Sequence, residues 1–221
     1  MNNLEKEINS LKKELLNMFL LVENQWKKST IAILEFDQDI AEEISSIENR
    51  VNALELTIDK KCENILALLS PVAIDLRFVL SAYKINHELE RVADIAESIA
   101  NYVANNDEAY PKEVLENLQV HDMMNEFNSM IIDIIDAFEE DDTKVARKIF
   151  KKDKKLNKYN EMAGKSIIRF FDKYNRENLM YLLSTIRKIE RAGDSLKNIG
   201  EEIIFHLEAK VIKHKEKNLS K

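Results

Sequence analysis

Apolar residues recur at steps of three and four along nearly the whole chain, and this spacing constrains the fold more than any other feature. One such stripe runs through residues 4–22, a second through 40–58 and a third through 72–99. Steps of this size place successive side chains on one face of an α-helix, where they can be buried together. The pattern therefore predicts a series of long amphipathic helices.

Glycine and proline are scarce, which supports the same conclusion. The 221 residues include 3 Gly and 2 Pro, where ordinary usage would give roughly fifteen and eleven. Hairpins use these residues in their turns, and a Rossmann turn or P-loop needs several glycines in one short window. Gly164, Gly193 and Gly200 form no such window. We therefore expect an all-α protein without a phosphate-binding glycine loop.

Breaks in the apolar pattern divide the chain into six predicted helices. Ser70 is suited to cap a helix that begins at Pro71. The segment 105–111 is the clearest break, and Asp141 and Asp142 suit a turn and a helix start. The predicted helices span residues 3–33, 36–68, 71–105, 112–139, 142–172 and 177–212.

An internal repeat groups these helices into two sets of three. Residues 90–94 (ERVAD) recur 100 positions later as 190–194 (ERAGD). Residues 48–52 (ENRVN) have a weaker echo 105 positions later in 153–157 (DKKLN). Each half thus contains an acid-xxx-Asn helix followed by a Glu-Arg-x-small-Asp helix.

The helix lengths indicate how each set packs. Helices of about thirty residues joined by short turns run antiparallel to their neighbours, and three of them form one bundle. We therefore expect two tandem three-helix bundles, in residues 1–108 and 109–221.

Charge and cysteine content exclude several classes of protein. The net charge is −7, which is unfavourable for general nucleic-acid binding. The single cysteine, Cys62, permits neither an internal disulfide nor a paired-cysteine zinc site. No apolar run reaches the roughly 20 residues of a membrane span, and no secretory signal is recognisable. We expect a cytoplasmic protein, and the basic tail 213–221 leaves peripheral attachment to an anionic membrane open.

Acidic pairs one helical turn apart mark both repeated helices. Glu90 and Asp94 share a helix face, as do Glu190 and Asp194. Matching faces on the preceding helices carry Glu48, Asn52, Glu55 and Asp59 in the first half, and Asp153, Asn157 and Glu161 in the second.

Two interpretations of these acidic faces are open. Each pair is explained most simply as a solvated surface, because the chain is rich in charged residues. Oxygen-rich sites also suit Mg, Mn or Fe, and Zn less exclusively, and duplication of the pattern favours metal binding. Gly193 inside a helix costs about 1 kcal/mol relative to Ala, so it indicates a close approach by a neighbour. Arg91 and Arg191 suit either a salt bridge or an anion.

The sequence contains no recognisable catalytic motif. None of the four histidines follows a Glu by three residues, so the Glu-x-x-His motif of di-iron bundles is absent. The HExxH and GxSxG motifs are absent as well. Cys62, Trp26 and the Met residues of 123–130 are expected in the core. We expect no enzyme, and a carboxylate-bridged metal enzyme is the weakest alternative.

The motifs together resemble those of the PhoU family of phosphate-signalling proteins. The family signature is a repeated Glu-Arg-x-Gly-Asp helix, preceded in the first repeat by Pro-x-Ala-x-Asp-Leu-Arg. Residues 71–77 read PVAIDLR, residues 90–94 and 190–194 supply the repeated motif, and Asn198-Ile199 follow the second copy. The resemblance covers essentially the whole chain, and it implies an all-α fold of two three-helix bundles related by a pseudo-twofold internal repeat.

The resemblance implies metal ions or clusters of Fe, Zn, Mn or Mg on the acidic motifs. The implied ligands are Glu48, Asn52, Glu90, Asp94, Asp153, Asn157, Glu190 and Asp194. The chain departs from the family where Ala93 replaces Gly and where Asn52 and Asn157 stand in place of Asp. Each Asn removes a negative charge, so weaker binding or fewer ions are expected.

The resemblance also implies a regulatory role. PhoU-like proteins link the ATPase subunit of the phosphate ABC transporter to a membrane sensor histidine kinase, and restrain starvation signalling when phosphate is plentiful. They often form homodimers. The alternative that the resemblance leaves open is an accessory protein of a single-component phosphate transporter.

Overall fold

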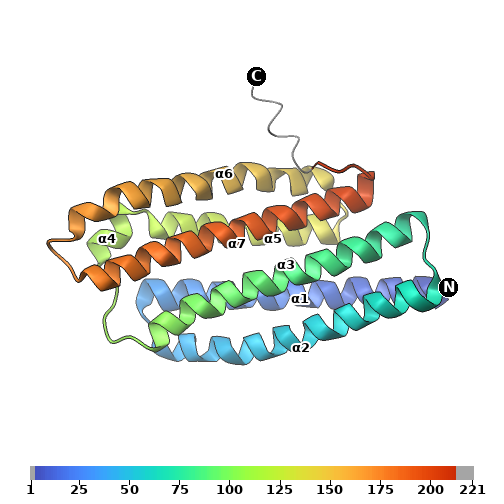
Figure 1. The fold of residues 1–221 in the computed structure, drawn as a ribbon, viewed down its shortest axis with the longest axis horizontal. Helices are drawn as coiled ribbons and strands as arrows, with labels where there is room; N and C mark the ends of the chain where they lie inside the picture. The colour runs from blue at the N-terminus through green and yellow to red at the C-terminus, as the bar shows by residue number, and fades with distance from the viewer. Residues whose placement is uncertain (1–2, 213–221) are drawn as a thin grey trace, which may run out of the picture.

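The chain folds into long helices, which Figure 1 shows side by side. The computed structural model describes residues 3–212, and within them there are helices and no strand, so the all-α prediction is confirmed. The elements are α1 (Asn3–Glu35), α2 (Gln38–Leu69), α3 (Ala73–Ala104), α4 (Lys112–Asn117), α5 (Val120–Glu139), α6 (Thr143–Ser166), the 3-10 helix η1 (Ile167–Phe170) and α7 (Arg176–Glu208).

Polar side chains fix the starts of three of the helices. Asp37, Asp142 and Asn175 each accept a hydrogen bond from a backbone N–H in the first turn of α2, α6 and α7, respectively. Such caps satisfy donors that have no partner within the helix. The predicted turn at Asp141 and Asp142 is confirmed, with Asp141 itself at a φ of 53°.

Several helix ends differ from the predicted ones. Ser70 does not cap the third helix; it ends α2 in the left-handed region, with φ 47°, and α3 begins at Ala73. Gln119, with φ 54°, divides the predicted helix 112–139 into α4 and α5. The predicted helix 142–172 ends as α6 at Ser166 and continues only as η1. A single residue in the left-handed conformation interrupts a helix without interrupting the spacing of its apolar residues. The spacing alone therefore does not predict such an interruption.

The final helix is also shorter than predicted. Helix α7 ends at Glu208 because Ala209 adopts the left-handed conformation, with φ 54°. The predicted basic tail, residues 213–221, lies outside the described residues. Between residues 3 and 212, no helix is both long enough and apolar enough to cross a bilayer.

The helices form two antiparallel sets that pack side by side. Helices α1, α2 and α3 contact one another, as do α5, α6 and α7. The two sets meet where α3 packs on α7 and α1 packs on α5, and in Figure 1 α3 and α7 run along the middle of the molecule. Each half therefore contributes a three-helix bundle to one continuous core.

Aromatic residues join the two bundles. The ring of Trp26 on α1 lies 4.0 Å from that of Phe127 on α5, measured between centroids, and Phe19 pairs with Phe138 at 5.1 Å. The indole N–H of Trp26 donates to the Val92 carbonyl at 2.9 Å, which satisfies the buried polar end of the ring. The predicted core positions are confirmed for Trp26, Cys62, Met123, Met124 and Met130.

Gly193 permits a close contact between α6 and α7, as its place inside a helix indicated. A Cβ atom at this position would lie 2.4 Å from Cδ1 of Leu156. The repeat places Ala93 and Val51 at the equivalent positions of the first half, and both are buried. Each half thus has a small residue at one of these equivalent positions and a larger one at the other.

We predict that Gly193→Ala stabilises the protein only when Leu156 is shortened. In a Leu156→Val background the substitution should raise the free energy of unfolding by about 1 kcal/mol through helix propensity. In the wild-type background Leu156 must leave its rotamer at a cost of about 1 kcal/mol, which cancels the gain. Urea unfolding of the four proteins measures the coupling, and equal effects of Gly193→Ala in both backgrounds would refute the contact.

His206 lies in the last turn of α7 against α3. Its ring meets Phe78 edge-on with centroids 5.1 Å apart, and its backbone carbonyl accepts a hydrogen bond from Arg77 Nε at 3.3 Å. The buried Nδ1 atom has no hydrogen-bond partner among the described residues. Burial lowers the pKa of His206, and nearby Asp141 opposes this effect.

The contribution of His206 to stability is therefore expected to fall as the pH drops below about 6.5, the ordinary pKa of histidine. Below that pH the unfolded chain takes up a proton that the folded state resists. His206→Leu should reduce this pH dependence, whereas His121→Gln, at an exposed position on α5, should leave it unchanged. Urea unfolding at pH 7.5 and pH 5.5 is the measurement. An unaltered pH dependence in His206→Leu would contradict the assignment.

Candidate metal centre

A group of carboxylates lies between α2 and α3 in the first half. Glu48 of α2 is only 4% exposed, and Gln25 Nε2 on α1 donates to its Oε2 atom at 2.6 Å. Its other oxygen, Oε1, is buried and has no hydrogen-bond partner among residues 3–212. Since a buried polar atom without a partner is costly, this oxygen fits a site for a cation.

The electrostatic environment of this group is strongly acidic. The pKa of Glu90 on α3 is raised to about 7, mainly by burial and in part by the neighbouring charges of Asp94, Glu55 and Glu48. Burial likewise raises the pKa of Glu48, aided by Asp94, Glu97 and Glu55 and opposed by the bond from Gln25. Carboxylates at such close quarters repel one another, and a multivalent cation would relieve the repulsion.

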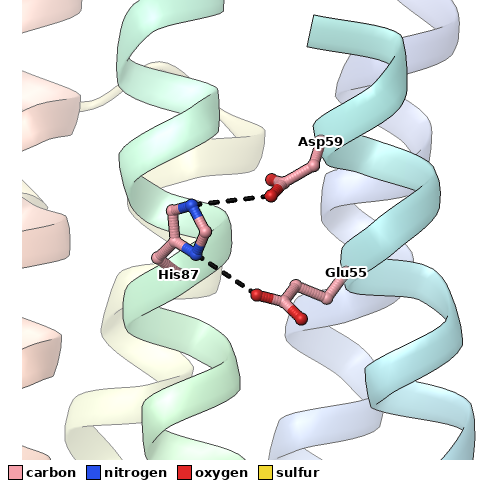
Figure 2. Close-up of side chains that lie close together, drawn as sticks. All are labelled: Glu55, Asp59 and His87. Carbon is pink, nitrogen blue, oxygen red and sulfur yellow. Dashed lines mark hydrogen bonds and ion pairs between the residues drawn. The ribbon is translucent and has the colours of Figure 1, made fainter. Parts of the chain in front are cut away.

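A second set of ligands lies next to these carboxylates, further along α2 and α3. Figure 2 shows Glu55 and Asp59 of α2 facing the imidazole of His87 on α3. His87 Nδ1 lies 3.2 Å from Glu55 Oε1, and its Nε2 lies 3.5 Å from Asp59 Oδ2. One ligand atom from each of the three residues lies within 4.8 Å of the others. Oxygen and imidazole ligands together suit Zn, Mn or Fe, and an imidazolium would also satisfy both carboxylates.

Asn86 of α3 forms hydrogen bonds with two members of this second set. Its buried side chain donates from Nδ2 to Asp59 Oδ1 at 2.8 Å and to the Glu55 carbonyl at 3.0 Å. The bond fixes the orientation of the Asp59 carboxylate, as partners of metal ligands commonly do.

The predicted ligand set omitted Glu55, Asp59 and His87. The sequence contained a signal for each of them. Glu55 and Asp59 lie on the same face of α2 as Glu48, and His87 precedes Glu90 by three residues on α3. The Glu-x-x-His motif does not include His87, because here the histidine comes before the glutamate.

The acidic group of the second half, between α6 and α7, is arranged differently. Asp153 of α6 is only 2% exposed, and Lys197 Nζ on α7 lies 3.2 Å from its Oδ2 atom. The same ammonium lies 3.8 Å from Asp194 Oδ1. Burial raises the pKa of Glu190, as do Asp194 and Asp153, but Arg191 and Lys197 oppose the rise. A cation that belongs to the chain is thus already present in this half.

The two asparagines of the predicted set lie at the margins. Asn52 and Asn157 are exposed, one turn after Glu48 and Asp153, respectively, and neither side chain makes a hydrogen bond with the described part of the chain. The eight predicted ligands therefore form two separate groups, one in each bundle. Only Glu48, Glu90 and Asp94 adjoin the ligands that the structure adds.

Both halves of the chain match the same known protein family. The profile of the PhoU domain matches residues 15–103 and again residues 120–203. The phosphate-specific transport system accessory protein PhoU of Escherichia coli (strain K12) is 30% identical over 213 residues, which cover 94% of this chain and 86% of that protein. The corresponding protein of Serratia marcescens shows the same identity and coverage.

Solved structures agree with the sequence matches. The crystal structure of PhoU from Pseudomonas aeruginosa superposes with a TM-score of 0.86 at 26% identity, covering 93% of this chain and 99% of that one. The phosphate transport system regulatory protein PhoU from Streptococcus pneumoniae gives 0.84 at 26% identity, with 96% and 100% covered. Because the PhoU domain matches the chain twice and crystal structures of PhoU proteins superpose on most of its length, this chain belongs to the PhoU family.

Proposed function

We propose that this protein regulates phosphate uptake and phosphate-starvation signalling as a metal-binding adaptor. Its partners would be the ATPase subunit of the phosphate ABC transporter and a membrane sensor histidine kinase, and it would restrain signalling when phosphate is plentiful. The observation that carries the proposal is the PhoU domain found twice, in a chain that covers most of the length of accessory and regulatory PhoU proteins. We assign it no catalytic residue.

The acidic group in the first half supports the metal-binding part of the proposal. Glu48, Glu90 and Asp94 would hold the ion, with Glu55, Asp59 and His87 available beside them. A bound ion of Fe, Zn, Mn or Mg would supply the positive charge that these carboxylates lack. The buried Oε1 atom of Glu48 has no hydrogen-bond partner among residues 3–212 and would give the ion a fixed ligand between α2 and α3.

In this role the protein would act at a membrane that it does not span. We propose that it acts as a homodimer at the cytoplasmic face, where both partners would be reached. Its acidic charge agrees with binding to proteins more than to nucleic acid. The alternative is an accessory role for a single-component phosphate transporter. The partner that the protein captures distinguishes the two roles.

Metal content tests the first part of the proposal. Purified protein should contain Fe, Zn, Mn or Mg by elemental analysis, and Glu90→Gln combined with Asp94→Asn should lower the affinity about 100-fold. Glu161→Gln, in an exposed pair with Lys165 on α6, serves as the control and should retain the metal. Removing the metal with EDTA should lower the melting temperature by several degrees, since the ion stabilises only the folded state. Equal metal content in the double variant would refute the ligand assignment.

Partner capture tests the second part. Crosslinking in phosphate-replete cells, followed by affinity purification and mass spectrometry, should recover the transporter ATPase or the sensor kinase. Cells that express an unrelated helical-bundle protein with the same tag provide the background. Recovery of a single-component phosphate transporter instead would establish the alternative, and recovery of none of the three would reject the adaptor role.

A further inference from the structure

The repeat equates Lys197 with an acidic residue of the first half. Helix α7 corresponds to α3 at an offset of 100 residues, so Lys197 occupies the position of Glu97. The contacts between α3 and α7 follow the same offset of 100 residues. Asn198 donates to Glu88 at 2.9 Å, and the equivalent positions, Ser98 and Lys188, are joined at 2.6 Å. The equivalence therefore holds in space as well as in sequence.

The exchange of Glu97 for Lys197 reverses the charge beside a buried carboxylate. In the first half, Glu97 adds negative charge to the surroundings of Glu48, whose Oε1 atom has no partner among the described residues. In the second half, Asp153 corresponds to Glu48, and the Lys197 ammonium lies 3.2 Å from its Oδ2 atom. Between residues 3 and 212, no ammonium or guanidinium forms an ion pair with Glu48, whereas Lys197 forms one with Asp153.

We infer that the two acidic sites are not equivalent: the ammonium of Lys197 takes the cation position of the second-half site, and multivalent cations bind only in the first half. This inference rests on the metal binding proposed above and specifies where it occurs. A metal ion at Asp153 and Asp194 would have to displace Lys197 from both carboxylates. The displaced ammonium would then lie close to the ion and repel it.

The neighbouring charges agree with this asymmetry. Arg191 and Lys197 both stabilise the ionised form of Glu190. The equivalent Glu90 is surrounded mainly by carboxylates, with His87 as the nearby group that acts in the opposite direction. A multivalent ion would therefore relieve much more repulsion in the first half than in the second.

The asymmetry has a consequence for regulation. The packing of α2 on α3 would depend on the metal, whereas the packing of α6 on α7 would be held by the bond between Lys197 and Asp153 at any metal concentration. A signal carried by metal occupancy would thus be confined to the first bundle.

Counting bound Mn²⁺ on the full-length protein tests the inference. Electron paramagnetic resonance measures free Mn²⁺ during a titration, and calorimetry gives the affinity. Glu90→Gln with Asp94→Asn should abolish tight binding, whereas Glu190→Gln with Asp194→Asn should leave the number of ions and the affinity unchanged. A loss of about half of the bound ions in the second variant would overturn the inference while leaving the proposed metal binding intact.

A charge exchange gives the reciprocal test. Lys197→Glu should add at least one Mn²⁺ per chain, and Glu97→Lys should remove binding from the first half. Lys188→Glu changes the net charge equally on the face of α7 that meets Ser98, and should add none. If Lys197→Glu unfolds, the neutral Lys197→Gln should still give weak additional binding. The same number of ions in every well-folded Lys197 variant would contradict the inference, and no binding to the wild type would reject the proposed metal function together with it.

Discussion

The antiparallel packing of α3 on α7 is the contact on which the rest of the molecule depends. Each of these helices belongs to its own bundle and also forms the boundary with the other bundle. Because each is held on both sides, it cannot rotate without disturbing two sets of contacts. The face that α7 turns toward α6 is therefore fixed, and Gly193, Glu190 and Asp194 lie on or beside it. Helix α3 holds Glu90 and Asp94 against α2 in the same way.

The two bundles share one backbone arrangement but differ in the charges that surround their buried carboxylates. In the first bundle, carboxylates gather around the partly buried Glu90, and the cost of their repulsion persists unless a cation arrives. In the second bundle, Lys197 supplies a positive charge from within the same helix as Glu190. A duplicated fold thus permits the two halves to diverge in charge while their packing stays alike, since the exchanged side chains lie at the margin of the core.

Much of the fold was predictable because it follows from short-range patterns. The three- and four-residue spacing predicted the long helices, and the offset between residues 90–94 and 190–194 predicted the two bundles. The turns were less predictable, since the left-handed conformations of Ser70 and Gln119 are single-residue events that the surrounding packing selects. The ligand set was only partly predictable, because helical spacing groups residues on one helix but does not say which faces of two helices meet. His87 lies close to Glu55 and Asp59 because α3 packs against α2, and this packing is a property of the tertiary structure.

The sequence by itself determined the helical class, the repeat, the family resemblance and the acidic character of both repeated helices. These properties depend on residue type and spacing, which are local and can be counted along the chain. Only the tertiary structure decided that the neutral amide of Gln25 donates to Glu48 while the ammonium of Lys197 donates to Asp153. The reason is physical: the energy of a buried charge depends on which groups lie within a few ångströms of it, and those groups come from different helices.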